Sequence, residues 1–350
     1  ALAGAAKAFS AMSDAGTERE MGVENVNIGA TDIEALAGFA KDKNIGLTIV
    51  GPEAPLVAGI TDLFESAGLR CFGPSKAAAQ LEGSKVFTKE FLKRHNIPTA
   101  GYKVFTDPEK AKVYLAGQDY PVVVKADGLA AGKGVIIAET YEQASTALEG
   151  MLSGRDFGSA GKRVVVEEFL SGEEASFIVM TDGRNILPLA TSQDHKAINN
   201  GDTGPNTGGM GAYSPAPVVT PEVHDRVMKE VILPTVKGMA SEGTPYTGFL
   251  YAGLMIGPEG VPKVLEYNCR FGDPETQPIL MRLKSDLVGM CIAALDKRLD
   301  RVQAQWDKRA ALGVVMAAGG YPESYRKGDA ISGLPQIGRA SCRERVYGTV

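Results

Sequence analysis

The chain has 350 residues and a net charge of −5, a length that predicts two or three domains with ample hydrophobic core. The acidic balance argues against a nucleic-acid binder, and no apolar run approaches the length of a membrane span. The cysteines are widely spaced and form no C-x-x-C pair, which favours a reducing cytosol over a zinc site or a disulfide framework. They are Cys71, Cys269, Cys291 and Cys342.

The first part of the chain alternates between short apolar strands and amphipathic helices. The pattern predicts strands at 25–28, 47–50 and 70–72 and helices at 32–43 and 57–67. Strand–helix–strand units joined by short turns imply a parallel sheet, and ligands of such sheets bind at the carboxyl ends of the strands. Gly51, Pro52 and Glu53 are therefore candidate substrate contacts, although a Gly-Pro pair is more commonly a simple turn.

The rest of the chain predicts mixed helices and strands. A helical stretch at 75–95 breaks near Gly83. After it we expect strands at 102–105, 122–125, 134–138 and 163–169, and a further strand in 311–318. The expected helices lie at 108–115, 142–152, 221–240 and 279–299. Two hairpins are expected, one of 175–182 with 185–191 and one of 247–256 with 262–268. Residues 193–217 are polar, rich in glycine and aperiodic, which indicates a functional loop because folded elements continue on both sides.

The functional interpretation begins with the segment PVVVKADGLAAGKGV. Its run of valines is typical of a buried strand and ends in Lys125. A loop with Gly128, Gly132, Lys133 and Gly134 follows. Glycines let backbone N–H groups approach anionic oxygens and lysines supply positive charge, so this segment suits a polyphosphate. It matches neither the Walker pattern nor G-x-G-x-x-G, and taken alone it is equally compatible with a surface hairpin.

A second candidate site is the segment VLEYNCRFGDPET. Glu266 and Asn268 are two residues apart on a predicted strand, so both side chains point to one face. A carboxylate and an amide oxygen suit Mg²⁺, and Arg270, expected on the same face, suits a phosphate or a carboxylate. Such a row is costly to bury without a ligand, and its apolar neighbours argue against a fully solvated strand face.

A third candidate site consists of acidic residues that follow another buried valine run. Glu167 and Glu168 end this strand, and Glu173 and Glu174 follow the next turn. Strand-end carboxylates and backbone groups can read the exocyclic amine and the ribose hydroxyls of a nucleoside. For any one of the four, an ordinary surface acid is the safer interpretation.

Eight segments occur in an order that resembles one known family. They are GPEAPLV, LEGSK, KADGLAAGKGV, EEFLSGEEAS, SQDHK, DTGPNTGGMGAYSP, GFLYAGLM and EYNCRFGDPETQ. Together they resemble the glycinamide ribonucleotide synthetase family of the ATP-grasp superfamily, over about residues 14–336, and eight ordered motifs make chance agreement negligible. The resemblance implies ATP-dependent coupling of glycine to 5-phosphoribosylamine in de novo purine synthesis.

The resemblance also implies a fold and a domain order. The expected class is α/β, with a partial N-terminal parallel-sheet domain at 14–84 that is similar to that of biotin carboxylases and lacks its first strand. An ATP-grasp domain of two α+β lobes follows at 85–298, and an incomplete β-rich C-terminal domain at 299–336. We expect residues 337–350 to be a non-native tail.

Site residues follow from the resemblance motif by motif. ATP is expected at Lys85, Lys125, Gly128, Gly132, Lys133, Gly134, Glu167, Glu168, Phe169, Leu170 and Glu174. Catalytic roles fall to Lys125, Arg270, Asp194, His195 and Lys196, and substrate contacts to Gly51, Pro52, Glu53, Gly208, Gly209, Met210, Gly211 and Asp273. Mg²⁺ or Mn²⁺ is expected at Glu266 and Asn268. The preceding strand, YAGLMI, carries no acidic residue, so a second metal ion would have to be bound by the same pair and by phosphate oxygens.

The implied mechanism is phosphoryl transfer followed by amide formation. The glycine carboxylate attacks the γ-phosphate, and the amine of phosphoribosylamine then attacks the acyl phosphate and expels phosphate. A closing glycine loop would protect that intermediate from water. No covalent nucleophile is needed, and a substrate-orienting hydrogen bond is a better role for His195 than that of a base.

The two ends of the chain depart from the family pattern. We expect the chain to start after the first strand and glycine-rich turn and to stop before the last strands, and therefore to bind Mg·ATP weakly and to ligate poorly or not at all. Two alternatives stay open: an ATP-grasp ligase for another carboxylate or amine, and a non-catalytic nucleotide-binding fragment. We also expect a cytoplasmic monomer whose partners are small molecules, with no nucleic acid and no membrane.

Overall fold

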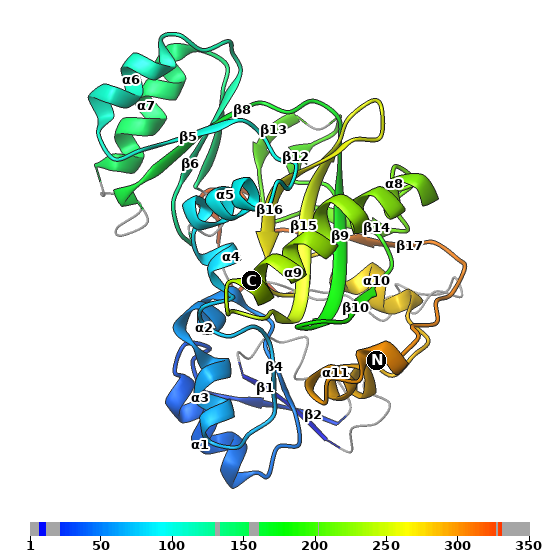
Figure 1. The fold of residues 1–350 in the computed structure, drawn as a ribbon. Coiled ribbons are helices and arrows are strands. Elements are labelled where there is room, and N and C mark those ends of the chain that lie inside the picture. Colours follow the sequence, from blue (N-terminus) through cyan, green and yellow to red (C-terminus); the bar gives the residue numbers. More distant parts are fainter. Residues whose placement is uncertain are drawn as a thin grey trace.

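The computed structural model of the chain describes residues 7–11, 22–129, 134–153, 161–201, 203–326 and 328–330. Gly132, Lys133 and the expected tail at 337–350 lie outside these residues. Within the described part, no helix combines the length and the apolar character needed to cross a bilayer. Figure 1 shows three parts: an N-terminal part at the bottom, a small lobe at the upper left and a larger lobe around a long sheet.

The N-terminal part contains two pairs of parallel strands. β1 (Ala8–Ala11) pairs with β2 (Val23–Val26), and β3 (Thr48–Ile49) pairs with β4 (Cys71–Phe72). The connecting helices are α1 (Ile33–Asp42), α2 (Glu53–Ala58) and α3 (Ile60–Ser66). The predicted parallel arrangement is confirmed, because each pair of strands runs in the same direction.

Two boundaries predicted in this part were wrong. The first predicted strand lies at 23–26 rather than 25–28. The helix predicted at 57–67 starts at Glu53 and is divided into two at Gly59, whose φ of 102° is incompatible with a right-handed helix.

The small lobe is a four-stranded antiparallel sheet covered on one face by two helices. Its strands are β5 (Tyr102–Phe105), β6 (Val122–Ala126), β7 (Val135–Ala138) and β8 (Val164–Glu168), in the order β5-β8-β6-β7. The helices α6 (Pro108–Leu115) and α7 (Tyr141–Leu152) pack on it side by side (Figure 1). Their N-caps, Asp107 and Thr140, accept hydrogen bonds from the first-turn N–H groups.

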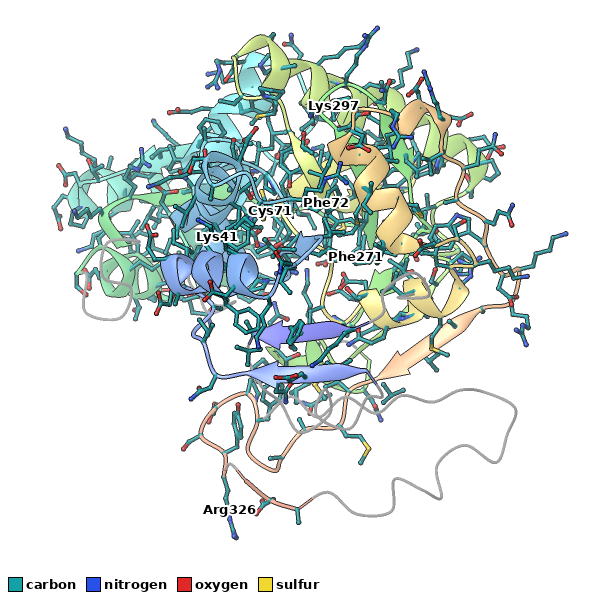
Figure 2. All side chains as sticks on the ribbon, turned by 90° about the horizontal axis from the view of Figure 1, so that it is seen from below. Lys41, Cys71, Phe72, Phe271, Lys297 and Arg326 are labelled. Carbon is teal, nitrogen blue, oxygen red and sulfur yellow. The ribbon has the colours of Figure 1, made fainter. Side chains whose placement is uncertain are left out.

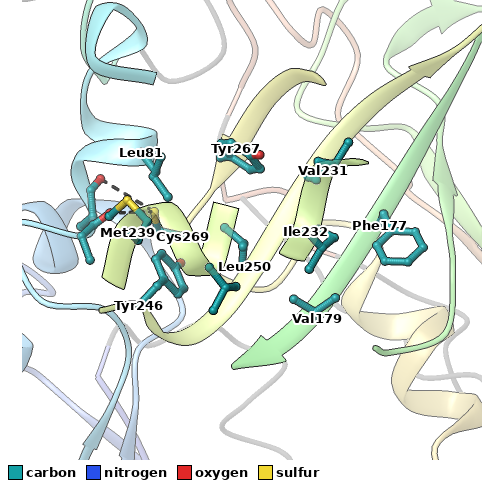
Figure 3. Packing of buried hydrophobic residues seen from close by; sticks show 14 of the residues in the cluster. Leu81, Phe177, Val179, Val231, Ile232, Met239, Tyr246, Leu250, Tyr267 and Cys269 are labelled. Carbon is teal, nitrogen blue, oxygen red and sulfur yellow. Dashed lines mark hydrogen bonds between the residues drawn. The ribbon is translucent and has the colours of Figure 1, made fainter. Parts of the chain in front are cut away.

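The large lobe is built on a second antiparallel sheet. Its strands are β9 (Glu173–Asp182), β10 (Ile186–Pro188), β15 (Thr247–Ile256) and β16 (Pro262–Asn268), in the order β10-β9-β15-β16. Successive side chains of β9 point to opposite faces of the sheet and pack in two different hydrophobic clusters. Phe177 and Val179 pack with Val231 and Ile232 (Figure 3). Ile178 and Met180 pack with residues of α11 (Leu287–Leu295) on the other face. Burial on both faces explains why these strands are nearly continuous in apolar residues.

Two helices predicted in the large lobe are interrupted. The helix predicted at 221–240 contains α8 (Pro221–Val227), a π-helical turn (Met228–Ile232) and α9 (Leu233–Ser241). The wide turn lies just before Pro234, which has no N–H to donate. The helix predicted at 279–299 is two helices, α10 (Thr276–Arg282) and α11, because Leu283 is extended and Asp286 caps a new start by accepting from Val288 and Gly289 N–H.

The segment at 193–217, predicted to lack regular structure, contains short strands. They are β11 (Gln193–Asp194), β12 (Ala197–Asn199), β13 (Thr203–Asn206) and β14 (Gly211–Ser214). β14 joins β11 to β17 (Ala311–Val314), and β12 pairs with β13. Strands this short and polar show no apolar alternation, which is why the sequence pattern missed them.

Two short helices connect the three parts. α4 (Gln80–Gly83) and α5 (Lys85–Arg94) are separated at Ser84, as the sequence predicted, and Ser84 Oγ accepts from Phe87 N–H as the N-cap of α5. An aromatic row ties β4 to the large sheet: Phe72 packs edge-on against Phe249 at 4.9 Å between ring centroids, and Phe249 against Phe271 at 4.8 Å. Figure 2 labels the two outer residues of this row, Phe72 and Phe271.

Candidate active site

A cavity of about 490 Å³ opens where α5, the small lobe and the large lobe meet. Lys125 from β6 and Glu266 from β16 both line it, although they are far apart in the sequence. The other predicted site residues in its wall are Glu53, Lys85, Gly128, Gly134, Glu167, Glu168, Phe169, Leu170, Glu174, Asp194, Lys196, Gly208, Asn268, Arg270 and Asp273. The sequence therefore identified residues from many separate elements that meet in one cavity.

Lys125 is held from both lobes. It is the fourth residue of β6, it is 6% exposed, and its Nζ donates to Glu167 Oε2 at 3.1 Å and to the backbone carbonyl of Leu265 at 3.2 Å. Glu167 belongs to the small lobe and Leu265 to β16 in the large lobe. The ammonium group is thus fixed at the junction of the two lobes, beside the cavity.

Lys85 and Asp127 fix the described start of the glycine loop. Lys85, the first residue of α5, donates from Nζ to the carbonyl of Gly128 at 3.0 Å, and burial lowers the pKa of Lys85. Asp127 Oδ1 accepts from Ser84 Oγ at 2.9 Å and from Val86 N–H at 3.1 Å, while its Oδ2 accepts from Arg163 Nε at 2.8 Å. One buried carboxylate therefore ties the start of α5 to the chain that leaves β6.

Glu266 and Asn268 are suited to a hard cation. Among the described residues neither side chain has a hydrogen bond or an ion pair, and both line the cavity from the same face of β16. Burial favours a neutral Glu266, but Lys196, Lys125 and Lys85 outweigh it and lower the pKa of this carboxyl, so it is ionised. The described residues contain no group of three or more His, Cys, Asp or Glu side chains that could hold a metal, so a cation here would also need oxygens from a bound phosphate.

Arg270 follows β16 and faces two carboxylates. Its Nε lies 3.6 Å from Glu82 Oε1 and 3.7 Å from Glu53 Oε2. Glu82 also accepts from the N–H of Cys269 at 2.6 Å, yet burial raises its pKa to about 7 despite Arg270. At this end of the cavity, Glu53 and Glu82 hold the guanidinium of Arg270 in place. Because Glu82 titrates near pH 7, the two acids neutralise the positive charge of Arg270 only in part at neutral pH.

Lys196 lies among acids at the end of the cavity nearest β11. Its Nζ is 3.1 Å from Glu174 Oε2 and 3.9 Å from Asp194 Oδ2. Burial opposes its charge, but Asp194, Glu266 and Glu174 together raise its pKa above the usual value. Burial raises the pKa of Asp194 to about 6. The cluster thus holds a permanently charged ammonium next to a carboxyl that can take up a proton near neutral pH.

A smaller cavity of about 250 Å³ adjoins the large one at the predicted adenine slot. Glu168, Phe169 and Leu170 line it from the end of β8, with Met255 and Lys263 opposite. Lys263 Nζ is 3.1 Å from Glu168 Oε1. The side chain of Glu167 does not line this smaller cavity. Its carboxylate instead forms ion pairs with Lys125 and Lys89.

Several predicted residues lie outside the cavity wall. They are Gly51, Pro52, His195, Gly209, Met210 and Gly211. Gly209 has a φ of 123°, and a Cβ there would meet Pro274 Cδ at 2.4 Å, so close packing on the segment after β16 requires glycine. His195 stacks obliquely on the ring of Tyr213 at 5.5 Å. The predicted roles of these residues in binding substrate stay predictions.

Sequence reasoning missed several buried polar residues in the cavity. Lys89 and Glu275 are 2% and 1% exposed, and Glu82 and Tyr251 also line the wall. Glu275 Oε1 accepts from Ser176 Oγ and Tyr251 Oη, whereas its Oε2 has no partner among the described residues. Lys89 could have been found from its position one helical turn after Lys85, and Glu82 from its place in the segment LEGSK.

Two family models match consecutive parts of the chain. The N domain of phosphoribosylglycinamide synthetase matches residues 3–82, and the ATP-grasp (A) domain of the same enzyme matches residues 83–276. A protein of Vibrio vulnificus named phosphoribosylamine–glycine ligase is 68% identical over 329 residues, which are 94% of this chain and 77% of that protein.

Solved structures agree with these matches. A phosphoribosylamine–glycine ligase from Thermotoga maritima is 38% identical with a TM-score of 0.66, and the match covers 74% of this chain and 65% of that one. A biotin carboxylase from Campylobacter jejuni, only 16% identical, has a TM-score of 0.65 and shares the fold. The two family models and these structures together confirm the predicted α/β architecture with its ATP-grasp lobes.

Proposed function

Because the chain belongs to the phosphoribosylglycinamide synthetase family of ATP-grasp ligases, we propose that it joins glycine to 5-phosphoribosylamine with ATP. The products are glycinamide ribonucleotide, ADP and phosphate. The observation that carries this proposal is the shared cavity, which both Lys125 and Glu266 line, with Lys85, Lys196 and Arg270 among the other lining residues. These cationic side chains suit the phosphates of ATP, and the ionised Glu266 suits a cation bound to those phosphates.

In the first step, the carboxylate oxygen of glycine attacks the γ-phosphorus of ATP, and the bond from that phosphorus to the leaving ADP oxygen breaks. Lys125 and Lys85, which line the cavity, would neutralise charge on the phosphate oxygens as it shifts towards ADP. The smaller cavity at Phe169 and Leu170 suits the adenine ring, with Glu174 near the ribose. Positioning and charge neutralisation are sufficient for this step, so it needs no covalent nucleophile.

In the second step, the amine of phosphoribosylamine attacks the acyl carbon of glycyl phosphate. The carbon–oxygen bond to phosphate breaks and the nitrogen loses a proton. Asp194, whose pKa burial raises to about 6, would accept that proton, and Lys196 and Arg270 would hold the anionic groups of the substrates. The glycine loop after Gly128 would exclude water, because an acyl phosphate hydrolyses readily.

We assign Mg²⁺, or Mn²⁺ in its place, to Glu266 and Asn268. These residues fit the ion because their oxygens share one strand face and lack other partners among the described residues. When bound, the ion would neutralise β- and γ-phosphate charge. One carboxylate and one amide are few protein ligands, and the described residues contain no group of three or more His, Cys, Asp or Glu that could hold a metal, which agrees with an ion that is held largely by nucleotide.

The test is a trap for the acyl phosphate. Hydroxylamine replaces phosphoribosylamine, and glycine hydroxamate and ADP are measured with ATP, Mg²⁺ and glycine together and with each left out. We expect hydroxamate only when all are present, and slow amide formation when phosphoribosylamine replaces the trap, in keeping with the poor ligation expected from the sequence. Hydroxamate from another amino acid but not from glycine would support a different ATP-grasp ligase, and nucleotide binding without ADP release would support a non-catalytic fragment.

The remaining expectations belong to this proposal. Small molecules are the partners that the cavity accommodates, and we propose a monomeric protein that works in the cytoplasm. Gel filtration with light scattering on the purified chain tests the monomer directly, since a dimer would double the measured mass.

A further inference from the structure

Lys89 is a buried lysine for which the proposed mechanism has no use. It lies on α5 one turn after Lys85, is 2% exposed, and lines the same cavity. An ammonium group removed from water to this extent is costly unless strong partners replace the lost hydration. Its environment should therefore show why the chain keeps it.

Two partners fix the Lys89 ammonium. Nζ lies 2.8 Å from Glu167 Oε2 and donates to Thr99 Oγ1 at 2.7 Å. The hydroxyl of Thr99 donates its own proton to the carbonyl of Val264 at 2.6 Å, so its oxygen can only accept from Lys89. Lys89 is thus tied at once to β8 of the small lobe and, through Thr99, to β16 of the large lobe.

The same carboxylate oxygen also serves Lys125. Glu167 Oε2 is 3.1 Å from Lys125 Nζ and 2.8 Å from Lys89 Nζ, while Glu167 Oε1 has no partner among the described residues. Two ammonium groups therefore share one carboxylate. When both are charged, the trio has a net charge of +1 next to the cavity, whereas Lys125 and Glu167 alone would sum to zero.

We propose that Lys89 is a positioning residue of the nucleotide site. It holds Glu167 and offsets its charge, so that the charge of Lys125 stays available to phosphate oxygens. This inference rests on the proposed function, because it assumes that the cavity receives the triphosphate.

The surroundings of Lys89 also predict a pH dependence. The charged and titratable groups that face it are Glu167 and Glu168 on β8, Lys125 on β6 and Tyr102 on β5. On its own helix, Lys85 lies one turn earlier. Burial lowers the pKa of Lys89 to about 8, with Glu167 opposing and Lys125 reinforcing the shift. As the pH rises through this value the trio loses its surplus charge, and phosphate binding should weaken.

The experiment compares Mg·ATP with adenosine, which has no phosphate, by calorimetry on four proteins. We expect Lys89→Met to weaken Mg·ATP binding about tenfold and to change adenosine binding by less than about twofold. Lys89→Met combined with Glu167→Gln should restore Mg·ATP binding to within about threefold of wild type, because the carboxylate that neutralises Lys125 is gone. Lys93→Met, which removes an exposed lysine of the same helix, is the matched control and should bind like wild type.

Each outcome decides the proposal. Between about pH 7 and about pH 9 the wild type should lose more affinity for Mg·ATP than Lys89→Met does. If the double variant binds as weakly as the single one, Lys89 contacts the phosphates itself and the positioning role is wrong. If Lys89→Met binds Mg·ATP normally, the positioning role of Lys89 is also wrong, but the proposed nucleotide site is not affected. If the wild type binds no Mg·ATP, both the positioning role and the proposed nucleotide site are wrong. Thermal melts confirm that each variant is folded.

Discussion

At the scale of single residues, the cavity is a set of charged groups that are removed from water and held by one another. Glu266 is ionised because Lys196, Lys125 and Lys85 overcome the cost of its burial. Glu82 is the opposite case, because burial outweighs Arg270 and raises its pKa to about 7. Similar burial therefore leaves one carboxyl ionised and lets the other titrate near neutral pH, because the nearby charges differ.

Glu82 predicts how stability depends on pH. Its pKa is higher in the folded state than the ordinary value of 4.5, so between these values the folded state binds more protons than the unfolded state. The contribution of Glu82 to stability is therefore present at low pH and lost as the pH rises through about 7. We expect Glu82→Gln to be more stable than wild type at about pH 8 by up to about 3 kcal/mol and close to wild type at about pH 4. Urea unfolding at both pH values measures this, and an equal effect at the two would contradict it.

Glu266 predicts a dependence on the metal ion. Glu266→Gln keeps the shape and removes the charge, so we expect turnover to fall about a hundredfold and the Mg²⁺ concentration for half-maximal rate to rise. Glu259→Gln, in the exposed turn of the same β15–β16 hairpin, is the matched control and should behave like wild type. Steady-state rates across a Mg²⁺ titration measure both. An unchanged Mg²⁺ requirement in Glu266→Gln would remove this residue from the metal site.

Sequence reasoning found the residues whose chemistry is visible locally. Lys125 at a strand end and the Glu266–Asn268 pair on one strand face could be identified from spacing alone. Lys89 and Glu275 could not, because their significance depends on contacts with residues far away in the chain: Lys89 with Glu167, and Glu275 with Ser176. A buried polar side chain on an apolar helix face looks like any solvated residue until the fold is known.

At the scale of elements, one carboxylate sets the start of the glycine loop relative to α5. Asp127 accepts from Val86 N–H at the first turn of α5 and from Arg163 Nε just before β8. It also accepts from Ser84 Oγ, the N-cap of the same helix. Asp127, directly after β6, therefore cannot move without disturbing the helix that carries Lys85 and Lys89.

Removing this connection should cost stability. Asp127→Ala leaves Val86 N–H and the Arg163 guanidinium without their buried partner, and we expect a loss of about 2–3 kcal/mol. Nucleotide affinity should fall as well, since Lys85 and Gly128 lose their relative position. Asp119→Ala, at an exposed site in the same lobe, is the control. A urea midpoint for Asp127→Ala equal to that of the control would show that these hydrogen bonds do not hold the loop.

Element boundaries were predictable wherever a strong local signal marked them. The β15–β16 hairpin matches its prediction because two apolar runs flank a Pro-Glu-Gly turn. The predicted helices at 57–67 and 279–299 were wrong because apolar spacing continues through Gly59 and through the extended Leu283. Tertiary contacts there override the periodicity.

At the scale of the whole molecule, the connecting helix α5 and the two lobes contribute to one site that none of them contains alone. α5 supplies Lys85 and Lys89, the small lobe Lys125 and Glu167, and the large lobe Glu266, Asn268 and Arg270. The fold class was predictable because the order of strands and helices limits the architectures available. The packing of the lobes against each other was not, because it rests on long-range contacts such as Lys125 to Leu265 and Phe72 to Phe249.

A structure of the chain bound to Mg²⁺ and a non-hydrolysable ATP analogue tests the central claim most directly. We predict that the triphosphate lies in the cavity between the lobes, with Lys125 on its terminal phosphates and the ion held by Glu266 and Asn268. A nucleotide bound elsewhere, with Lys125 and Glu266 touching neither phosphate nor metal, would contradict the account.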